Sequence, residues 1–266
     1  MKAWRVVFVP LFALGMSVHA QWLKYPTAGV PRLSNGQPNL SAPAPRTADG
    51  KPDLSGVWQL ETACPADGCR DYPGAPEFLN LGAKLRGGLP YQPWAAQLVK
   101  TRSADLGKDD PVAWCRPGGA VRILTFPPFR KFVQLPGLFI ILSERDVTYR
   151  QIFTDGRPLP QDPEPSWNGY STGRWQGDAL VVETNGLRDG TWLDRNGSPM
   201  TDAARMIERF RRVNYGRLEV ELTIDDPKAY TRPWSVTLTQ TIVLDTDLLD
   251  YHCLDNEKDA AHAVGK

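Results

Sequence analysis

The stretch RLEVELTID, at residues 217–225, decides the fold class of this chain. Its apolar side chains occupy every second position and polar side chains lie between them: Leu218, Val220, Leu222 and Ile224 against Glu219, Glu221 and Thr223. Successive side chains of a β-strand point to opposite faces of the sheet. The alternation therefore predicts a strand with one face buried and the other in water.

Similar runs extend on both sides of this strand. The turn Asn214-Tyr215-Gly216 connects it directly to the run before it, as in an up-and-down sheet. Apolar or alternating runs separated by turn residues occupy residues 122–127, 132–135, 138–144, 147–153, 169–185, 206–213 and 234–244. A meander leaves exposed edges unless it closes on itself. We therefore predict a mainly β protein, either an antiparallel up-and-down barrel or a strongly curved sheet.

The rest of the chain divides into an arm, a first strand and a helix. Residues 21–52 are rich in Pro, Gly, Ser and Asn, which predicts an irregular arm or linker. Trp58 lies in a first strand within residues 53–61, and a short helical insertion is predicted at about residues 90–106, where Pro93 suits a first helical turn. We predict a single barrel domain over residues 53–266, with no internal repeat and no Rossmann or P-loop glycine pattern.

Residues 1–20 predict the compartment. Lys2 and Arg5 precede an apolar run at residues 6–16, and Val18-His19-Ala20 precedes Gln21. This pattern is typical of a signal peptide cleaved after Ala20. The alternative, an uncleaved anchor, is less favoured because the run is short for a membrane span. We expect a periplasmic or secreted protein that is not inserted in a membrane after cleavage.

The charge balance argues against two classes of partner. Without Lys2 and Arg5 the chain keeps 29 basic against 30 acidic side chains. Nucleic acids and anionic membranes favour basic surfaces, so neither is an expected partner. The sequence does not indicate an oligomeric state.

All four cysteines follow the predicted cleavage point. An even number in an oxidising compartment favours disulfides. Of the three possible pairings we predict Cys64 with Cys69, which closes a short loop, and Cys115 with Cys253. A zinc site is the alternative, but a CxxxxC pair with two distant single cysteines lacks the usual CxxC spacing.

Two segments resemble known families. Gly56-Val57-Trp58 resembles the GxW start of lipocalins and other calycin-type barrels, in which the tryptophan plugs the closed end. The long arm and the 60 or so residues before the main run of strands depart from a lipocalin. The second half, with GRWQGDALVVETNG at residues 173–186 and TIDDPKAYTRPW at 223–234, resembles a widespread family of exported bacterial proteins of unknown function.

One predicted strand has a nearly bare face. Gly169, Ser171 and Gly173 lie two residues apart between Trp167 and Trp175. Either neighbouring elements of the protein pack closely there, or the indoles enclose a cavity. Aromatic residues concentrate in this half of the chain, and the predicted ligand-binding set is Trp167, Tyr170, Trp175, Trp192, Tyr230 and Trp234, together with Asp155.

Four polar residues are candidates for chemistry. Arg150 and Arg157 flank a strand end, where they either lie in solvent or hold a carboxylate or phenolate in bidentate fashion. Glu183 and Glu208 each share a strand face with apolar residues. A buried carboxyl either pairs with an arginine or acquires a raised pKa suited to acid–base catalysis.

Metal and serine chemistry are not expected. Only His252 and His262 remain after cleavage, which excludes a three-histidine zinc site, and no GxSxG elbow is present. The predicted cofactor and metal content is therefore none.

Two hypotheses of function follow. The first is an exported calycin-like barrel that binds a small, partly apolar organic molecule. Such a barrel would either bind alone or also catalyse isomerisation, cyclisation, elimination or hydration, with Glu183 and Glu208 as acid–base groups and Arg150 or Arg157 stabilising negative charge. The alternative is a carbohydrate-binding or cell-envelope interaction protein, in which tryptophans stack on glycan.

Overall fold

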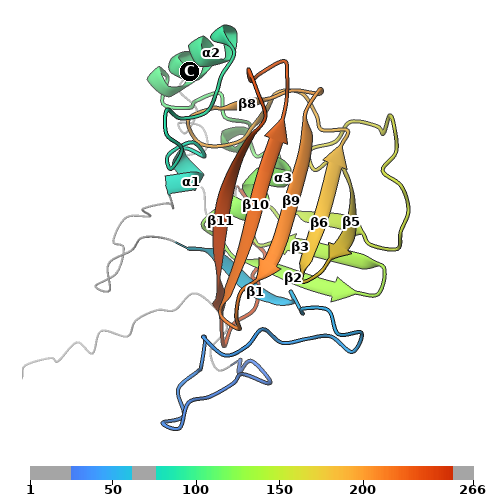
Figure 1. Cartoon of the computed structure of the whole chain (residues 1–266). Coiled ribbons are helices and arrows are strands. Elements are labelled where there is room, and N and C mark those ends of the chain that lie inside the picture. Colours follow the sequence, from blue (N-terminus) through green and yellow to red (C-terminus); the bar gives the residue numbers. More distant parts are fainter. Residues whose placement is uncertain (1–24, 62–75, 254–266) are drawn as a thin grey trace, which may run out of the picture.

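The computed structural model describes residues 25–61 and 76–253, and nine of its strands form a closed barrel (Figure 1). Around the barrel the order is β1-β11-β10-β9-β6-β5-β4-β3-β2. The strands are β1 (Gly56–Leu60), β2 (Arg130–Leu135), β3 (Leu138–Ser143), β4 (Tyr149–Phe153), β5 (Tyr170–Gln176), β6 (Ala179–Asn185), β9 (Arg205–Arg212), β10 (Arg217–Asp225) and β11 (Trp234–Val243). The predicted mainly β fold is confirmed, as is the closure of the sheet into a barrel.

One join departs from the predicted up-and-down antiparallel pattern. β4 and β5 are parallel, and only Ile152↔Ser171 and Phe153↔Thr172 are in register between them. The pair is parallel because residues 154–169 carry the chain from one end of the barrel back to the other before β5 begins. The other joins are antiparallel, so this short seam is where the closed sheet is least supported by backbone hydrogen bonds.

The interior of the barrel is packed with the protein's own side chains. In β9 and β10 every second residue is buried, which confirms the alternation seen in the sequence. Phe132, Phe139 and Phe210 meet edge to face with ring centroids 5.4–5.9 Å apart, and Trp58 lies 6.3 Å from Phe132. Edge-to-face contacts of this kind stabilise a core beyond the area they bury.

Helix α3 (Gly119–Thr125) closes the end of the barrel opposite the arm, and all of its residues are buried. The prediction of a strand at residues 122–127 was wrong, because a short apolar run buried on all sides reads alike as strand or helix. The side chains of Arg130 on β2 and Gln240 on β11 donate hydrogen bonds to the carbonyl of Leu124. Arg130 also donates to the carbonyl of Phe126. These donors satisfy carbonyls at the C-terminal end of the helix.

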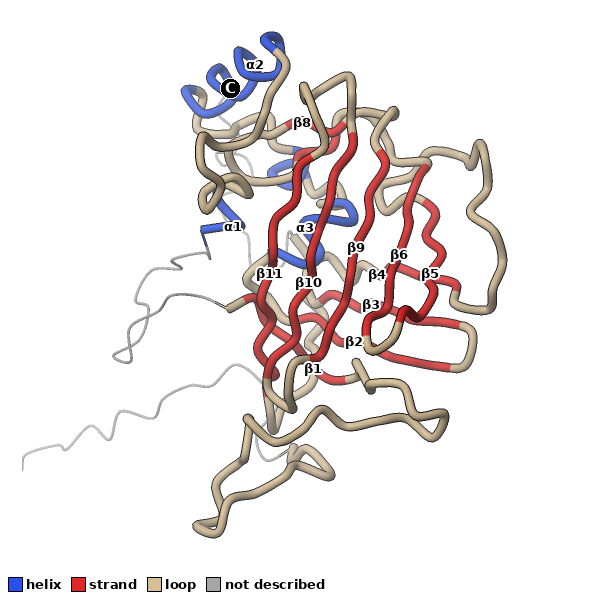
Figure 2. Tube along the Cα trace, in the orientation of Figure 1, coloured by secondary structure: helices blue, strands red, loops and turns tan. Residues whose placement is uncertain are grey.

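The other helices lie outside the barrel. α2 (Pro93–Ala104) begins at the predicted Pro93, and the short α1 (Pro76–Leu79) and the 3-10 helix η1 (Pro111–Trp114) lie before and after it in the chain. α2 is held above the two-stranded sheet of β7 (Thr191–Trp192) and β8 (Pro199–Met200), away from the barrel wall (Figure 2). Among the described residues no helix is long and apolar enough to cross a membrane.

The arm contains a repeat that the sequence analysis missed. PRLSNGQPNL at residues 31–40 and PRTADGKPDL at residues 45–54 share Pro, Arg, Asn or Asp, Gly, Pro, Asn or Asp, and Leu at equivalent positions. Both form the same turn: Arg32 donates to the Gly36 carbonyl at 2.7 Å, and Arg46 to the Gly50 carbonyl at 2.8 Å. Both glycines have positive φ, 83° and 79°, which favours glycine at this position.

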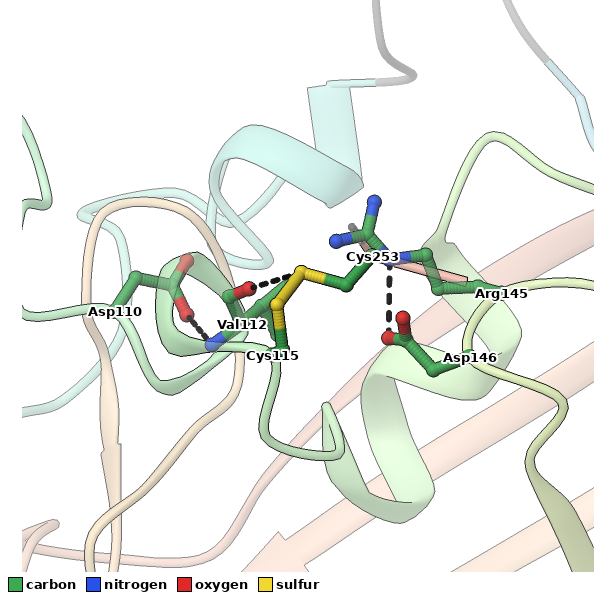
Figure 3. Close-up of a disulfide and its surroundings, with 6 residues drawn as sticks. All are labelled: Asp110, Val112, Cys115, Arg145, Asp146 and Cys253. Carbon is green, nitrogen blue, oxygen red and sulfur yellow. Dashed lines mark hydrogen bonds and ion pairs between the residues drawn. A yellow bond between two sulfur atoms is a disulfide. The ribbon is translucent and has the colours of Figure 1, made fainter. Parts of the chain in front are cut away.

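A disulfide joins Cys115 to Cys253 as predicted (Figure 3). It ties the turn that leads into α3 to the last described segment of the chain. The predicted Cys64–Cys69 pair and the signal peptide at residues 1–20 lie outside the described residues.

Candidate functional site

The bare face of β5 is filled by packing. A Cβ atom on Gly169 would lie 2.5 Å from the carbonyl oxygen of Asn185, and one on Gly173 would lie 3.1–3.2 Å from side-chain carbons of Ile152, Thr154 and Leu180. The missing side chains therefore leave no room for a ligand. Of the two readings of this face, close packing within the protein is the one the geometry supports.

Ser171, on the same face, belongs to a buried polar cluster. Arg150 donates to both carboxylate oxygens of Glu208, at 2.8 and 2.6 Å, and also to the hydroxyls of Ser171 and Thr184. The side chains of Arg150 and Glu208 are 1% and 0% exposed. Because every strong acceptor of Glu208 is taken by one guanidinium, the pair has the geometry of a structural ion pair.

The other two charged candidates do not join this cluster. Glu183 is opposite Ile207 in the sheet, on the outer face, where it pairs with Arg174 at 2.6 Å. Arg157 is exposed and pairs with Asp155 at 2.6 Å while stacking on Phe153. The hydrogen bonds that the Arg157 guanidinium donates to Asp155 raise its pKa above the ordinary value. Glu183 and Glu208 thus lie on opposite faces and do not form an acid–base pair.

The predicted aromatic set is not gathered in one pocket. Trp192, Tyr230 and Trp234 are buried in the core, and Tyr230 meets Trp234 edge to face at 5.4 Å. The half-buried members are spread elsewhere: Trp167 lies under the Arg188 guanidinium, Tyr170 stacks on Phe153, and Trp175 packs against the core. Burial raises the pKa of the Tyr230 phenol, which donates to the carbonyl of Pro199.

A groove of about 510 Å³ lies beneath α2, outside the barrel. Trp94, Leu98 and Arg102 line it from one face of the helix, at successive intervals of four residues. Its floor is Pro199, Met200 and Thr201 of the β8 segment, and its rim carries Asp189, Gly190, Asp202 and Lys228. This volume lies within the range of about 300–1,000 Å³ that small-molecule sites occupy.

The groove stays open because α2 is anchored at its two ends. Near its start, the Trp94 indole N–H donates to the carbonyl of Lys228 at 2.8 Å, and the backbone N–H of Gln92 donates to Ala229. Near its end, Arg102 donates to the carbonyl of Gly197 at 2.7 Å. Between these anchors the helix buries only Ala95, so it spans the groove without filling it.

The charges of the groove are only partly paired. Lys228 and Asp202 form an ion pair at 2.6 Å, whereas Arg102 and Asp189 form no ion pair with any described residue. Arg102 lies 4.4 Å over the Trp192 ring. Burial lowers the pKa of the Arg102 guanidinium, and the carboxylates of Asp110, Asp109 and Asp189 offset part of that shift.

Sequence reasoning missed this groove. Trp94, Leu98 and Arg102 lie four residues apart on one face of the predicted helix, and this spacing was the available signal. Within the described residues no group of three or more His, Cys, Asp or Glu side chains is placed to hold a metal ion. No model of a known protein family matches this chain, and no curated protein matches it either.

Proposed function

We propose that this protein binds a small, partly apolar organic molecule in the groove between α2 and β8. The observation that carries the proposal is the groove itself: an open volume of about 510 Å³ with an indole wall, an apolar floor and charged groups at its rim. Sites of this composition are typical of small-molecule binding. The filled interior of the barrel supports placing the site outside it.

The proposed function is binding of the ligand without catalysis. Both oxygens of Glu208 are held by Arg150, and Glu183 lies on the outer face, so neither carboxylate is placed next to the groove to move a proton. The proposal places the protein in an oxidising compartment, periplasmic or extracellular. The pattern of residues 1–20 and the Cys115–Cys253 disulfide support that placement.

The test is a binding screen with a matched pair of tryptophan variants. Trp94 and Trp114 are both about half exposed, and each indole N–H donates to a lysine carbonyl, of Lys228 and Lys108 respectively. Only Trp94 lines the groove. Native mass spectrometry of the wild type, Trp94→Ala and Trp114→Ala should be run against a panel of charged and neutral ring compounds and oligosaccharides.

We expect ring compounds to bind the wild type and Trp114→Ala equally, and Trp94→Ala about tenfold more weakly, since a large apolar contact is lost. Equal binding by all three proteins would contradict the proposal. Trp94 is also the observation that favours the carbohydrate alternative, because a half-exposed indole in a groove that also carries the carboxylates of Asp189 and Asp202 suits a sugar ring. A response to oligosaccharides alone would replace the first function with that one.

A further inference from the structure

Arg102 is fixed in place yet keeps most of its donors unused. Its aliphatic stem passes against Gly197, where a Cβ atom would lie 2.6 Å from the Arg102 Cδ. Its guanidinium stacks on Trp192, and of its nitrogens only Nη1 has a hydrogen-bond partner in the described part of the chain, the carbonyl of Gly197. A guanidinium held in this way loses little conformational entropy when it binds an anion.

Asp189 is the group of complementary charge among the residues that line the groove. It lines the same groove, it is exposed, and it has no hydrogen bond or ion pair with the residues that the structure describes. Its charge acts on both cations of the groove: it offsets part of the burial that lowers the pKa of Arg102, and it adds to the effect of Asp202, which raises the pKa of Lys228. The Lys228 charge is already matched by Asp202. One cation and one anion therefore remain unmatched.

These two charges specify the chemistry of a ligand. A simple anion would satisfy Arg102 but leave the Asp189 charge unmatched, and a simple cation would satisfy Asp189 but leave the Arg102 charge unmatched. A molecule with both charges meets neither penalty. Trp94, Leu98 and Met200 line the same groove and offer an apolar surface for a side chain.

We propose that the groove binds a zwitterion, an amino acid or short peptide with an apolar side chain, whose carboxylate contacts Arg102 and whose ammonium contacts Asp189. This inference rests on the proposed function, because it names the ligand class of the same groove. It adds a requirement that the proposed function does not make, namely that both charges be present on one ligand.

The test compares ligands that differ in one charge. L-phenylalanine and L-alanyl-L-phenylalanine carry both charges, 3-phenylpropionate lacks the ammonium, and phenethylamine lacks the carboxylate. Isothermal titration calorimetry with the wild type should give one of the two zwitterions an affinity about tenfold above either single-charge compound, since charge-assisted hydrogen bonds are the strong ones. The zwitterion that binds tighter shows whether the groove takes a free amino acid or a peptide.

Asp189→Asn should lower zwitterion affinity about tenfold and leave 3-phenylpropionate binding unchanged or tighter. Arg102→Met, which keeps the stem, should lower the affinity for the zwitterion and for 3-phenylpropionate but not for phenethylamine. Asp162→Asn removes an exposed carboxylate outside the groove and should change nothing.

The outcomes separate the two proposals. If phenethylamine, 3-phenylpropionate and the zwitterions bind equally, and Asp189→Asn has no effect, the zwitterion inference is overturned while the groove remains a binding site. If none of the four compounds binds, nor any ring compound of the wider panel, the proposed function fails together with the inference.

Discussion

At the scale of single residues, Arg150 and Glu208 form a buried ion pair inside the barrel. Arg150 extends from β4 across the short parallel seam to Ser171 on β5, Thr184 on β6 and Glu208 on β9. It therefore links four strands where the backbone register is only two residues long. We infer that the pair reinforces the seam.

Removing one partner of this pair should cost more than removing both. Glu208→Leu leaves a buried guanidinium without a counter-charge, and Arg150→Met leaves a buried carboxylate. Each change should lower the free energy of unfolding by about 3–5 kcal/mol. In the double variant no charge remains, and the hydroxyls of Ser171 and Thr184 still bond to one another at 2.9 Å. Urea denaturation of all four proteins measures the coupling, and strictly additive losses would contradict it.

Gly169 gives a second prediction at this scale. Gly169 and Gly177 both have positive φ, 64° and 60°, but a Cβ on Gly177 would meet nothing within 4 Å. Gly177→Ala should therefore cost only the left-handed backbone penalty, about 1–2 kcal/mol. Gly169→Ala adds overlap with the Asn185 carbonyl and should cost more than about 3 kcal/mol. Chemical denaturation compares them, and equal losses would show that the close approach at Gly169 relaxes freely.

At the scale of elements, the two arm repeats differ in what they contact. Arg46 of the second repeat donates to both carboxylate oxygens of Asp178 in the β5–β6 turn, at 3.0 and 2.9 Å, and Leu54 of that repeat is fully buried. In the first repeat, the only hydrogen bond of Arg32 among the described residues is to Gly36, and Leu40 is 40% exposed. The second repeat is thus docked on the barrel to a greater extent than the first.

The repeats provide their own control for a hydrogen-exchange experiment. Arg46→Ala removes the contact to Asp178 and should speed amide exchange at residues 47–53 about threefold, the scale of one exposed ion pair. Arg32→Ala removes the same turn contact without an acidic partner, and it should speed exchange at the equivalent residues 33–39 of its own repeat to a smaller extent. Equal effects of the two variants would mean that the turn itself, and not the docking to Asp178, protects the second repeat.

A helix or strand could be predicted from the sequence where its own residues carry the pattern of burial, and it could not where distant parts of the chain bury it. The strands around residues 217–225 were predicted because alternation reports directly on a half-buried strand. α3 was mistaken for a strand because its burial comes from the surrounding barrel, which no short run encodes. Glu183 and Glu208 have similar local patterns, and only the register between strands, with Glu208 opposite Val182, decides which of them points inward.

At the scale of the whole molecule, the unpredicted contacts are those between distant parts of the chain. Arg150 and Glu208 were both selected from sequence, but their pairing spans 58 residues. The groove combines α2 with the segments at Asp189, β8 and Lys228, so its unmatched charges become visible only in three dimensions. Composition and strand pattern therefore predicted the architecture, whereas the candidate site depends on tertiary contacts.

The Cys115–Cys253 disulfide spans 138 residues, and the loop that it closes contains eight of the nine barrel strands. The C-terminal segment that it holds also bonds to the β3–β4 turn, where the backbone N–H of Asp146 donates to the Tyr251 carbonyl at 2.8 Å.

Cross-linking so long a loop restricts the conformational freedom of the unfolded chain. The Cys115→Ser/Cys253→Ser double variant should therefore unfold with a free energy lower by about 2–4 kcal/mol. Urea denaturation without reductant measures this loss. A second titration of the variant with reductant measures the contribution of the predicted Cys64–Cys69 disulfide. An unchanged midpoint in the double variant would mean that the noncovalent contacts around Tyr251 hold the segment without the bond, and that the unfolded chain gains little freedom when the bond is removed.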